Sequence, residues 1–460
     1  MHRIVGAVED RSAHGIVGAV DDRSARGIAA AISRLITEDV LTVGTRLPTV
    51  RELARELSIS PTTVSEAWQT LARVGAIETR GRLGTFVLNA AGPVGPRRYR
   101  RVTEGPGHFA QDLSTGTPDP QLLPDLGPSL ARVSRNNLTT SYLDLPVLPA
   151  LDEALRAAWP FPPQALTVVD GALDALDRIV SLVVHHGDRV LVEHPCFPPL
   201  LDMLEQLGAE PIGLAMDEHG IVPSMLAAAL DQSPVALFLQ PRAHNPAGTS
   251  LSAARAAELA AILAHTAIVV IEDDHAGDIA AAPYVSLGTY LPDRTLHIRS
   301  YSKSHGPDLR LAAIGGAGPI IERLVERRLL GPGWSSRLLQ AVLLELLHEP
   351  AALAAVAEAR AVYADRRHAL CAALTERGVT FTGHDGINLW VEVPDERTAI
   401  VTLAARGIGV APGTPFLVNA SITDHLRVTV GQVRDRFEDL ADHLAAAAAP
   451  GPGRPHRRGR

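Results

Sequence analysis

The chain has 460 residues, of which 46% are hydrophobic and 20% charged, a balance typical of folded globular domains and not of disordered chains. Its net charge of −8 excludes nucleic-acid binding through an overall positive surface, so any such contact has to be local. Two cysteines, Cys196 and Cys371, exclude a disulfide framework, and no apolar run reaches the length of a membrane span. Together with an N-terminus that lacks a signal-peptide pattern, these features predict a cytoplasmic protein of two or three domains.

The first 25 residues contain a repeat with a period of 12, in which His2–Ala13 recurs as His14–Ala25. This period is too short for the usual solenoid units, so a local duplication or a start codon placed too early is the expected cause. We predict an N-terminal extension over residues 1–25 that is poorly ordered at its beginning, and we assign it no function.

Residues 26–90 have the pattern of a winged helix-turn-helix. Apolar spacing predicts helices over residues 28–36 and 50–57 and from Pro61 to about residue 74, with Ser60 as the cap of the third helix. Two short strand-like segments, residues 75–80 and 81–87, follow and form a hairpin with a Gly/Arg tip. We expect the second helix of the motif to enter the DNA major groove, while the tip meets phosphates or the minor groove.

This stretch resembles the DNA-binding domain of the GntR family in the segments Leu47–Ala54, Ser60–Val64 and Gly81–Val87. The hairpin tip and the resemblance together predict contacts with DNA from Arg51, Thr62, Thr63, Arg80, Arg82 and Gly84. The family usually has arginine at Pro61 and often a basic residue near Ser65, so this recognition helix carries less positive charge than usual. A protein-binding module is the alternative for this domain.

Residues 91–109 are predicted to be a linker, because the segment at 91–96 is rich in proline and glycine. The basic cluster Arg97–Arg101 lies within it, and either contacts the DNA backbone or belongs to a solvated linker.

From 110 to 445 the pattern changes to alternating strands and helices, which predicts an α/β domain with a mainly parallel central sheet covered on both faces. Short apolar runs predict strands over residues 189–193, 211–215, 235–239, 267–272 and 295–299. In such sheets the functional residues lie beyond the carboxyl ends of the strands.

Lys303 is the only lysine among 43 basic residues and follows the last of these strands. A lysine amine can lose its proton and form a Schiff base, whereas an arginine guanidinium cannot. Its neighbours Ser300, Ser302 and Arg310 are groups that bind a phosphate. A chance surface lysine is the alternative.

Three further candidates lie at strand ends. Asp273 ends one strand and could hold a protonated ring nitrogen, cap a helix or, with Asp274 and Asp278, bind a metal ion. Asn245 lies in an Asn-Pro turn, which needs no ligand to exist, and Gly171 precedes a helix whose amides could bind an anion.

The order of these motifs resembles that of the fold-type I aminotransferases of class I/II, over about 330 residues. The resemblance implies pyridoxal 5′-phosphate as cofactor, with Lys303 forming the aldimine, Asp273 holding the pyridine nitrogen and Asn245 bonding the phenolic oxygen. It also implies a ring-stacking Phe197 and an Arg427 that binds a substrate carboxylate. The residues that it places around the phosphate are Asp170, Gly171, Ala172, Ser300, Ser302, Arg310 and, from a partner subunit, Tyr142.

Two departures from that family bear on the site. His275 stands where the family has a tyrosine that bonds the phenolic oxygen; histidine can still donate, but its charge would depend on pH. Asp170 replaces a hydroxyl, and an acid beside a phosphate is unfavourable unless it points away.

A GntR-like head joined to an aminotransferase-like body resembles the MocR subfamily of transcriptional regulators. The resemblance implies a cytoplasmic homodimer that binds double-stranded operator DNA, with pyridoxal phosphate or its aldimine with an amino compound as the effector, sensed through Lys303. The alternatives are an active class I/II aminotransferase with a fused DNA-binding domain, and a repressor whose body has lost the cofactor. No metal is expected, and the basic tail at 446–460 is predicted to be disordered.

Overall fold

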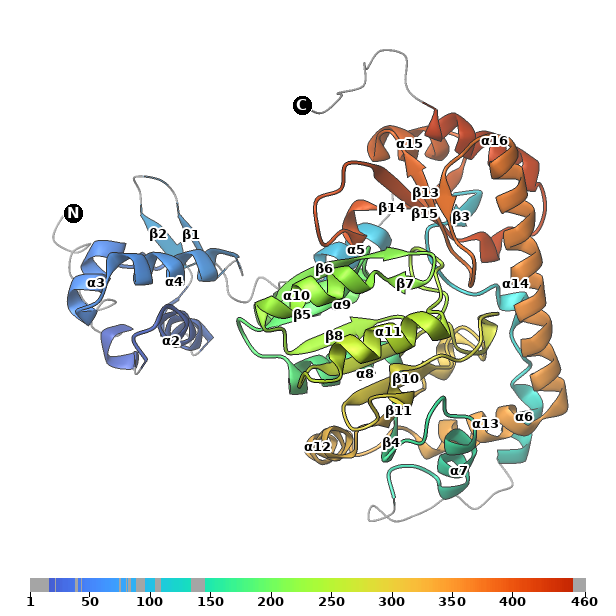
Figure 1. The fold of residues 1–460 in the computed structure, drawn as a ribbon, viewed down its shortest axis with the longest axis horizontal. Coiled ribbons are helices and arrows are strands. Elements are labelled where there is room, and N and C mark those ends of the chain that lie inside the picture. The colour runs from blue at the N-terminus through green and yellow to red at the C-terminus, as the bar shows by residue number, and fades with distance from the viewer. Residues whose placement is uncertain are drawn as a thin grey trace. The chain divides into compact units, whose positions relative to one another are not determined.

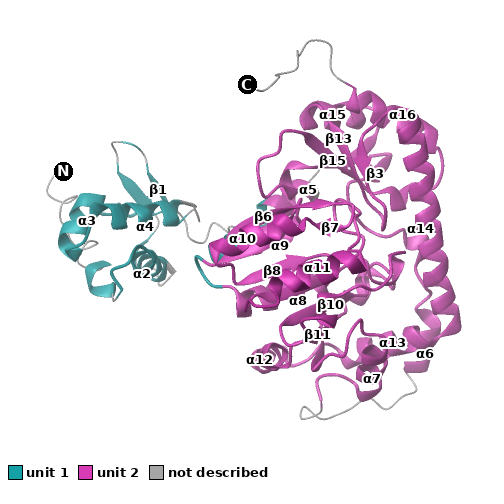
Figure 2. Cartoon of the chain, in the orientation of Figure 1, with its two compact units in different colours: residues 1–97, 185–187, 204–209 teal, residues 98–184, 188–203, 210–460 magenta. Residues whose placement is uncertain are grey.

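The structure is a computed structural model that describes residues 16–20, 22–37, 40–42, 44–73, 76–79, 81, 84–87, 96–103, 109–133 and 145–449. The chain divides into two compact units (Figure 2). The first takes in residues 1–97 with the short segments 185–187 and 204–209, and the second takes in 98–184, 188–203 and 210–460. Below, the head is residues 16–87 and the body is residues 98–449.

The head contains the expected helices and hairpin (Figure 1). Its elements are α2 (Ala25–Thr37), α3 (Val50–Leu57), α4 (Pro61–Arg73), β1 (Ile77–Thr79) and β2 (Thr85–Val87). The two strands pair antiparallel, with Ile77 opposite Val87. The predicted winged helix-turn-helix is therefore confirmed.

Local signals in the sequence fix the ends of α3 and α4. Thr49 and Glu52 form a reciprocal capping box at the start of α3, which satisfies amides that the helix itself leaves free. Ser60 accepts from the amide of Thr62, as expected for the residue that precedes Pro61.

The core of the head also includes the second copy of the N-terminal repeat. Ile16 and Val20 are buried in the same cluster as Ile32, Leu53 and Leu71. The first copy, where poor order was expected, lies outside the described residues.

The body is built on an eight-stranded sheet with the order β4-β11-β10-β9-β8-β5-β6-β7. The strands are β4 (Ala165–Val169), β5 (Arg189–His194), β6 (Glu210–Asp217), β7 (Gly220–Ile221), β8 (Ala236–Leu239), β9 (Val269–Asp274), β10 (Thr295–Ser300) and β11 (Ala312–Gly316). β5, β6, β8, β9 and β10 pair in parallel, whereas β11 runs antiparallel to both of its neighbours. The expected mainly parallel sheet is confirmed.

Helices cover both faces of this sheet, as the alternation of side chains along β8 shows. Leu237 and Leu239 are buried in one cluster with residues of α10 and α11, whereas Phe238 lies beside Leu176 of α8 and Leu200 of α9. The helices of this part are α6 (Gly127–Val133), α7 (Pro149–Ala157), α8 (Ala172–Val183), α9 (Pro198–Leu207), α10 (Pro223–Ala229), α11 (Ala253–Leu263), α12 (Gly318–Leu329) and α13 (Arg337–His348).

The long helix α14 (Pro350–Glu376) runs along the body to a smaller, five-stranded sheet (Figure 1). This sheet has the order β12-β13-β15-β14-β3. Its strands are β3 (Gln111–Leu113), β12 (Phe381–Thr382), β13 (Leu389–Val393), β14 (Ile408–Pro412) and β15 (Asp424–Val428), and the helices beside them are α15 (Glu396–Ala404) and α16 (Phe437–Ala448). Leu370 and Leu374 of α14 are buried among these elements, which joins the small sheet to the rest of the body.

The basic cluster expected in the linker forms a short helix, α5 (Arg97–Thr103). The amides of Arg98 and Tyr99 donate to the carboxylate of Asp202, so the start of this helix is fixed to the body. Most of the predicted basic tail, residues 450–460, lies outside the described residues.

In the described part of the chain, no single helix is both long and apolar enough to cross a membrane. The helices α13 and α14, which meet at 76°, reach that length and composition only as a bent pair.

Candidate functional site

Lys303 lies in the turn that follows β10, where it is partly buried. Its Nζ is 2.5 Å from Nδ1 of His275, which follows the neighbouring strand β9. Burial lowers the pKa of Lys303 to about 8, although the nearby carboxylate of Asp273 favours the charged form. A neutral amine is therefore accessible near neutral pH, which is the form that attacks a carbonyl carbon.

Asp273 is buried near the end of β9, and only one of its carboxylate oxygens is hydrogen-bonded. Oδ2 accepts from Nε2 of Gln240 at 2.8 Å, while Oδ1 has no hydrogen-bond partner among the described residues. Burial raises the pKa of Asp273 to about 6, although the hydrogen bond from Gln240 and the charge of Lys303 oppose this rise. The site thus contains a buried carboxylate with room for one more hydrogen-bond donor.

Gln240 is a residue that the sequence analysis missed. It follows the end of β8, and besides binding Asp273 it accepts through Oε1 from the amide of Asn245 at 2.8 Å. Gln240 could have been selected from the sequence, because it directly follows a buried strand, the same signal that identified Asp273. No sequence pattern indicated that Gln240 connects Asp273 and Asn245.

Asn245 and Arg427 are brought together although they are 182 residues apart in the sequence. Nη1 of Arg427 lies 3.4 Å from Oδ1 of Asn245, and its Nη2 donates to the carbonyl oxygen of Ser114. Burial lowers the pKa of Arg427 to about 10, and within the described part of the chain its Nε has no partner. A carboxylate ligand would supply the missing charge and acceptor.

The residues predicted to surround a phosphate lie near the start of α8. Gly171 precedes the helix with φ 102°, and Ala172 is its first residue, so the first amides of α8 lack acceptors within the helix and could bind an anion. Arg310 reaches this turn, because its Nη2 donates to the carbonyl oxygen of Asp170 at 3.3 Å. Ser300 and Ser302 lie on the neighbouring turn, where the amide of Ser302 donates to Oγ of Ser300 at 3.4 Å.

Asp170 is the acid that was expected to be unfavourable beside a phosphate, and in the structure it is paired with a cation. Its carboxylate pairs with the buried Arg328, with Oδ2 3.2 Å from Nη2. Arg328 also donates to the carbonyl oxygen of Val168, so the acid is compensated by a fixed cation.

Phe197 lies beside Asp273, Gln240 and Cys196 around a small hollow between α8, α9 and the sheet. Tyr142 lies outside the described residues.

His275 lies between the turn after β8 and Lys303. Burial, together with the neighbouring Lys303, lowers the pKa of His275 well below its ordinary value, which favours the neutral ring. Its Nε2 is 3.0 Å from the carbonyl oxygen of Ala243, which leaves Nδ1 toward Lys303.

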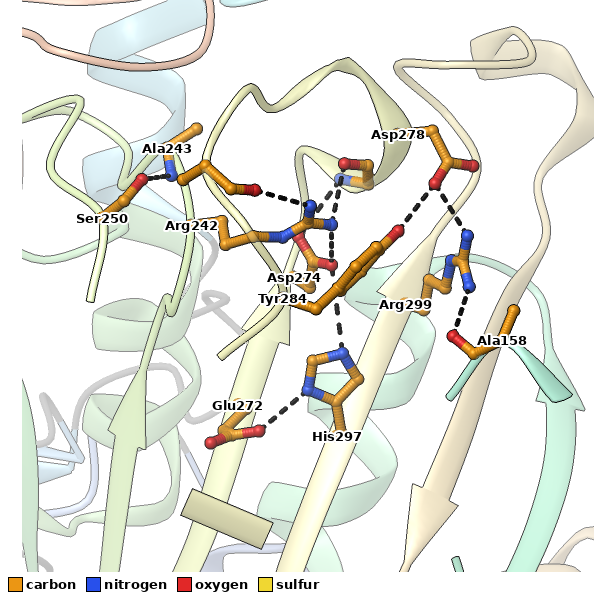
Figure 3. Close-up of polar contacts among 12 residues, drawn as sticks. Ala158, Arg242, Ala243, Ser250, Glu272, Asp274, Asp278, Tyr284, His297 and Arg299 are labelled. Carbon is orange, nitrogen blue, oxygen red and sulfur yellow. Dashed lines mark hydrogen bonds and ion pairs between the residues drawn. The ribbon is translucent and has the colours of Figure 1, made fainter. Parts of the chain in front are cut away.

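The metal site considered for Asp273, Asp274 and Asp278 is not formed. Figure 3 shows Asp274 paired with Arg242, and Asp278 paired with Arg299, in a buried polar cluster around Tyr284. Alternation along β9 directs Asp273 to the opposite face from Asp274, so the carboxylates do not converge. Among the described residues, no group of three or more His, Cys, Asp or Glu side chains could hold a metal ion.

Four of the residues predicted to contact DNA are described. Arg51 is exposed on α3, Thr62 and Thr63 lie in the first turn of α4, and Gly84 directly precedes β2 with φ 107°. A Cβ on Gly84 would lie 2.7 Å from Nε of Arg46, a basic residue beside the hairpin that the sequence analysis did not select. Arg80 and Arg82 lie outside the described residues.

Comparison with known proteins matches each unit to a family. Residues 24–87 match the model of bacterial regulatory proteins of the gntR family, and residues 111–444 match aminotransferase class I and II. Proteins of the second family typically bind pyridoxal phosphate. The structure is similar to that of LysN, an α-aminoadipate aminotransferase from Thermus thermophilus, with a TM-score of 0.68 and 21% identity over 78% of this chain and 96% of that one.

Relatives that align with both units are transcriptional regulators. The vitamin B6 salvage pathway transcriptional repressor PtsJ of Salmonella typhimurium is 37% identical over 85% of this chain and 90% of its own length. The HTH-type transcriptional regulator TauR of Rhodobacter capsulatus is 26% identical over 83% of this chain and 88% of its own length. The chain therefore belongs to the MocR subfamily of GntR-family transcriptional regulators, in which a winged helix-turn-helix head is fused to an aminotransferase-like body.

Proposed function

We propose that this regulator binds pyridoxal 5′-phosphate covalently through Lys303, and that the bound cofactor or its adduct with an amino compound changes the affinity of the head for operator DNA. The observation that carries the proposal is the buried carboxylate of Asp273, whose Oδ1 lacks a partner among the described residues while Lys303 lies nearby.

The cofactor's pyridine ring fits this carboxylate. A protonated ring nitrogen would donate to Oδ1 of Asp273, and its positive charge would stabilise this carboxylate, whose pKa is raised by burial. Gln240 would hold the carboxylate in place through Oδ2. Phe197 would lie on the ring face, and Asn245 would bond the phenolic oxygen.

The phosphate fits the turn before α8. Gly171 and Ala172 would bind it through helix-start amides, Ser300 and Ser302 through hydroxyl groups, and Arg310 through its guanidinium. A side chain at Gly171 would crowd Arg310, because a Cβ there would lie 3.5 Å from the guanidinium carbon. We also propose a homodimer, in which Tyr142 of each subunit reaches the phosphate bound by the other.

Pyridoxal phosphate, when bound, supplies an aldehyde carbon at which one amine can replace another. Lys303 is the resident amine, and its lowered pKa makes the neutral form needed for this exchange more accessible than in an ordinary lysine. Arg427 would bind the carboxylate of an incoming amino acid, since it is a buried cation whose Nε lacks a partner within the described part of the chain. The effector is therefore an amino compound that carries a carboxylate.

Regulation requires that the effector favour one arrangement of the body over another, because a ligand shifts an equilibrium only by its differential affinity. We propose that release of Lys303 from the cofactor provides this difference and alters the placement of two heads on DNA in the cytoplasm. Arg51, Thr62, Thr63, Arg80, Arg82 and Gly84 would make the DNA contacts. The name of the Salmonella relative makes promoters of vitamin B6 genes the first candidates for operators.

The covalent step can be tested directly, because the chain has a single lysine. The purified protein is incubated with pyridoxal phosphate, reduced with borohydride, digested and analysed by mass spectrometry. We expect one reduced adduct, on the peptide that contains Lys303, and loss of the visible absorbance band in Lys303→Ala. A visible band that persists in Lys303→Ala, or no adduct on that peptide in the wild-type protein, would contradict the proposal.

A further inference from the structure

His275 lies where the ends of three neighbouring strands meet. It follows β9, its Nε2 approaches the carbonyl oxygen of Ala243 in the turn after β8, and its Nδ1 approaches Lys303 after β10. The ring is therefore held between a fixed backbone group on one side and the reactive amine on the other.

The partner on the Nε2 side determines which nitrogen carries the proton. A backbone carbonyl oxygen can only accept, so the contact of 3.0 Å requires a hydrogen on Nε2. In a neutral ring Nδ1 then has a lone pair and no hydrogen, and it can only accept from the Lys303 ammonium at 2.5 Å.

Burial is the largest cause that favours a neutral ring. The charges of Lys303 and Arg242, together with His244, also disfavour a second proton, whereas the contact with Ala243 opposes this effect. Around Lys303 itself, Asp273 and Asp274 favour the ammonium form, whereas burial and Arg427 oppose it.

We propose that His275 acts as a hydrogen-bond acceptor that positions the amine of Lys303, and that it offers no donor to the cofactor's phenolic oxygen. The role of this contact in regulation rests on the proposed function, whereas its test requires neither the cofactor nor DNA. A tyrosine, the usual residue here, can donate through its hydroxyl group and so stabilises an anionic phenolic oxygen. Neutral His275 would instead stabilise the ammonium form of Lys303, from which its Nδ1 accepts a hydrogen bond.

The single lysine makes this proposal measurable in the full-length protein without cofactor. Labelling with [ζ-15N]lysine gives one side-chain resonance, whose titration reports the pKa of Lys303 alone. Removal of the acceptor in His275→Phe should lower this pKa by about one further unit, because a hydrogen bond to a charged group is lost. His275→Asn, whose side-chain oxygen lies at the Nδ1 position, should restore most of the difference.

Two controls separate this role from simple packing. His305→Phe removes another buried histidine, whose ring nitrogen contacts Ser304, and it should leave the titration of Lys303 unchanged. In the wild-type protein, the 15N shifts of His275 should show a hydrogen on Nε2 and none on Nδ1. An unchanged Lys303 titration in His275→Phe, or a hydrogen on Nδ1, would overturn the proposal even if cofactor binding and DNA regulation were both demonstrated.

Discussion

Lys303 and Asp273 occupy one buried site that disfavours the charge of each. Burial lowers the pKa of Lys303 to about 8 and raises that of Asp273 to about 6, and their mutual attraction only partly offsets this. Groups that are destabilised in this way are typical of binding sites, because a ligand that completes them gains the interaction that the free protein lacks.

The burial of the charged carboxylate of Asp273 should lower the stability of the cofactor-free protein. Asp273 binds its proton more tightly in the folded state than in the unfolded state, so the free energy of unfolding falls as pH rises from about 4 through about 6. Asp273→Asn removes the charge and retains an acceptor for Gln240. We expect it to raise the free energy of unfolding by up to about 3 kcal/mol at pH 8, measured by urea denaturation.

The pH dependence provides the internal control for Asp273→Asn. The difference from the wild-type protein should shrink as pH falls toward 4, where Asp273 is protonated in the folded state and approaches its own pKa of 3.8 in the unfolded state. A variant less stable than the wild-type protein at pH 8 would show that the carboxylate is already compensated.

At the scale of elements, the site depends on parallel strands that end at the same edge of the sheet. β8, β9 and β10 are neighbours, so Gln240, Asp273 and Lys303 come together although their turns are far apart in sequence. α8 begins at this edge with Gly171, whose φ of 102° is unfavourable for any residue with a side chain.

Gly171→Ala should therefore impair both folding and cofactor binding. We expect a loss of about 1 kcal/mol in the free energy of unfolding from the backbone conformation, and roughly tenfold weaker pyridoxal phosphate binding in an absorbance titration. Gly187→Ala is the matched control, because Gly187 also has a positive φ, of 82°, but has no atom within 4 Å of its would-be Cβ. Equal cofactor affinities of the two variants would contradict a phosphate site at α8.

In the head, α3 presents Arg51 to solvent. If Arg51 contacts a DNA phosphate, Arg51→Ala should weaken binding to all sequences and reduce the slope of log affinity against log salt by about 1. Fluorescence anisotropy over a salt series measures this slope. Arg189→Ala, at an exposed arginine of the body, should leave the slope unchanged. An unchanged slope in Arg51→Ala would remove this residue from the DNA interface.

Much of the fold could be predicted from sequence, because its signals are local. Short apolar runs located β5, β8, β9 and β10 to within a few residues, and Ser60 with Pro61 marked the start of α4. The antiparallel strand β11 was not among the expected strands, since a run of small residues at Ala312–Gly316 reads weakly as a strand.

The site was less predictable where long-range contacts decide it. The compensation of Asp170 by Arg328 joins residues 158 positions apart, and the role of Gln240 depends on which strands are neighbours. The lowered pKa of His275 follows from burial, and its tautomer follows from the contact with Ala243. A local sequence pattern encodes neither.

At the scale of the whole molecule, the chain combines a DNA-binding head and an aminotransferase-like body as two compact units. An aminotransferase has no need of the head, and a simple repressor has no need of a partly buried lysine with a lowered pKa. Both features are explained if the chemistry at Lys303 controls the binding of DNA.

The most direct test is the affinity of the full-length protein for the intergenic DNA beside its gene, with and without pyridoxal phosphate and an amino acid. Lys303→Arg is the matched variant, because it retains the positive charge and loses the amine chemistry. We predict that the ligands change the affinity of the wild-type protein by at least about fivefold and leave that of Lys303→Arg unchanged. Equal changes in both proteins, or none in the wild-type protein, would contradict the account.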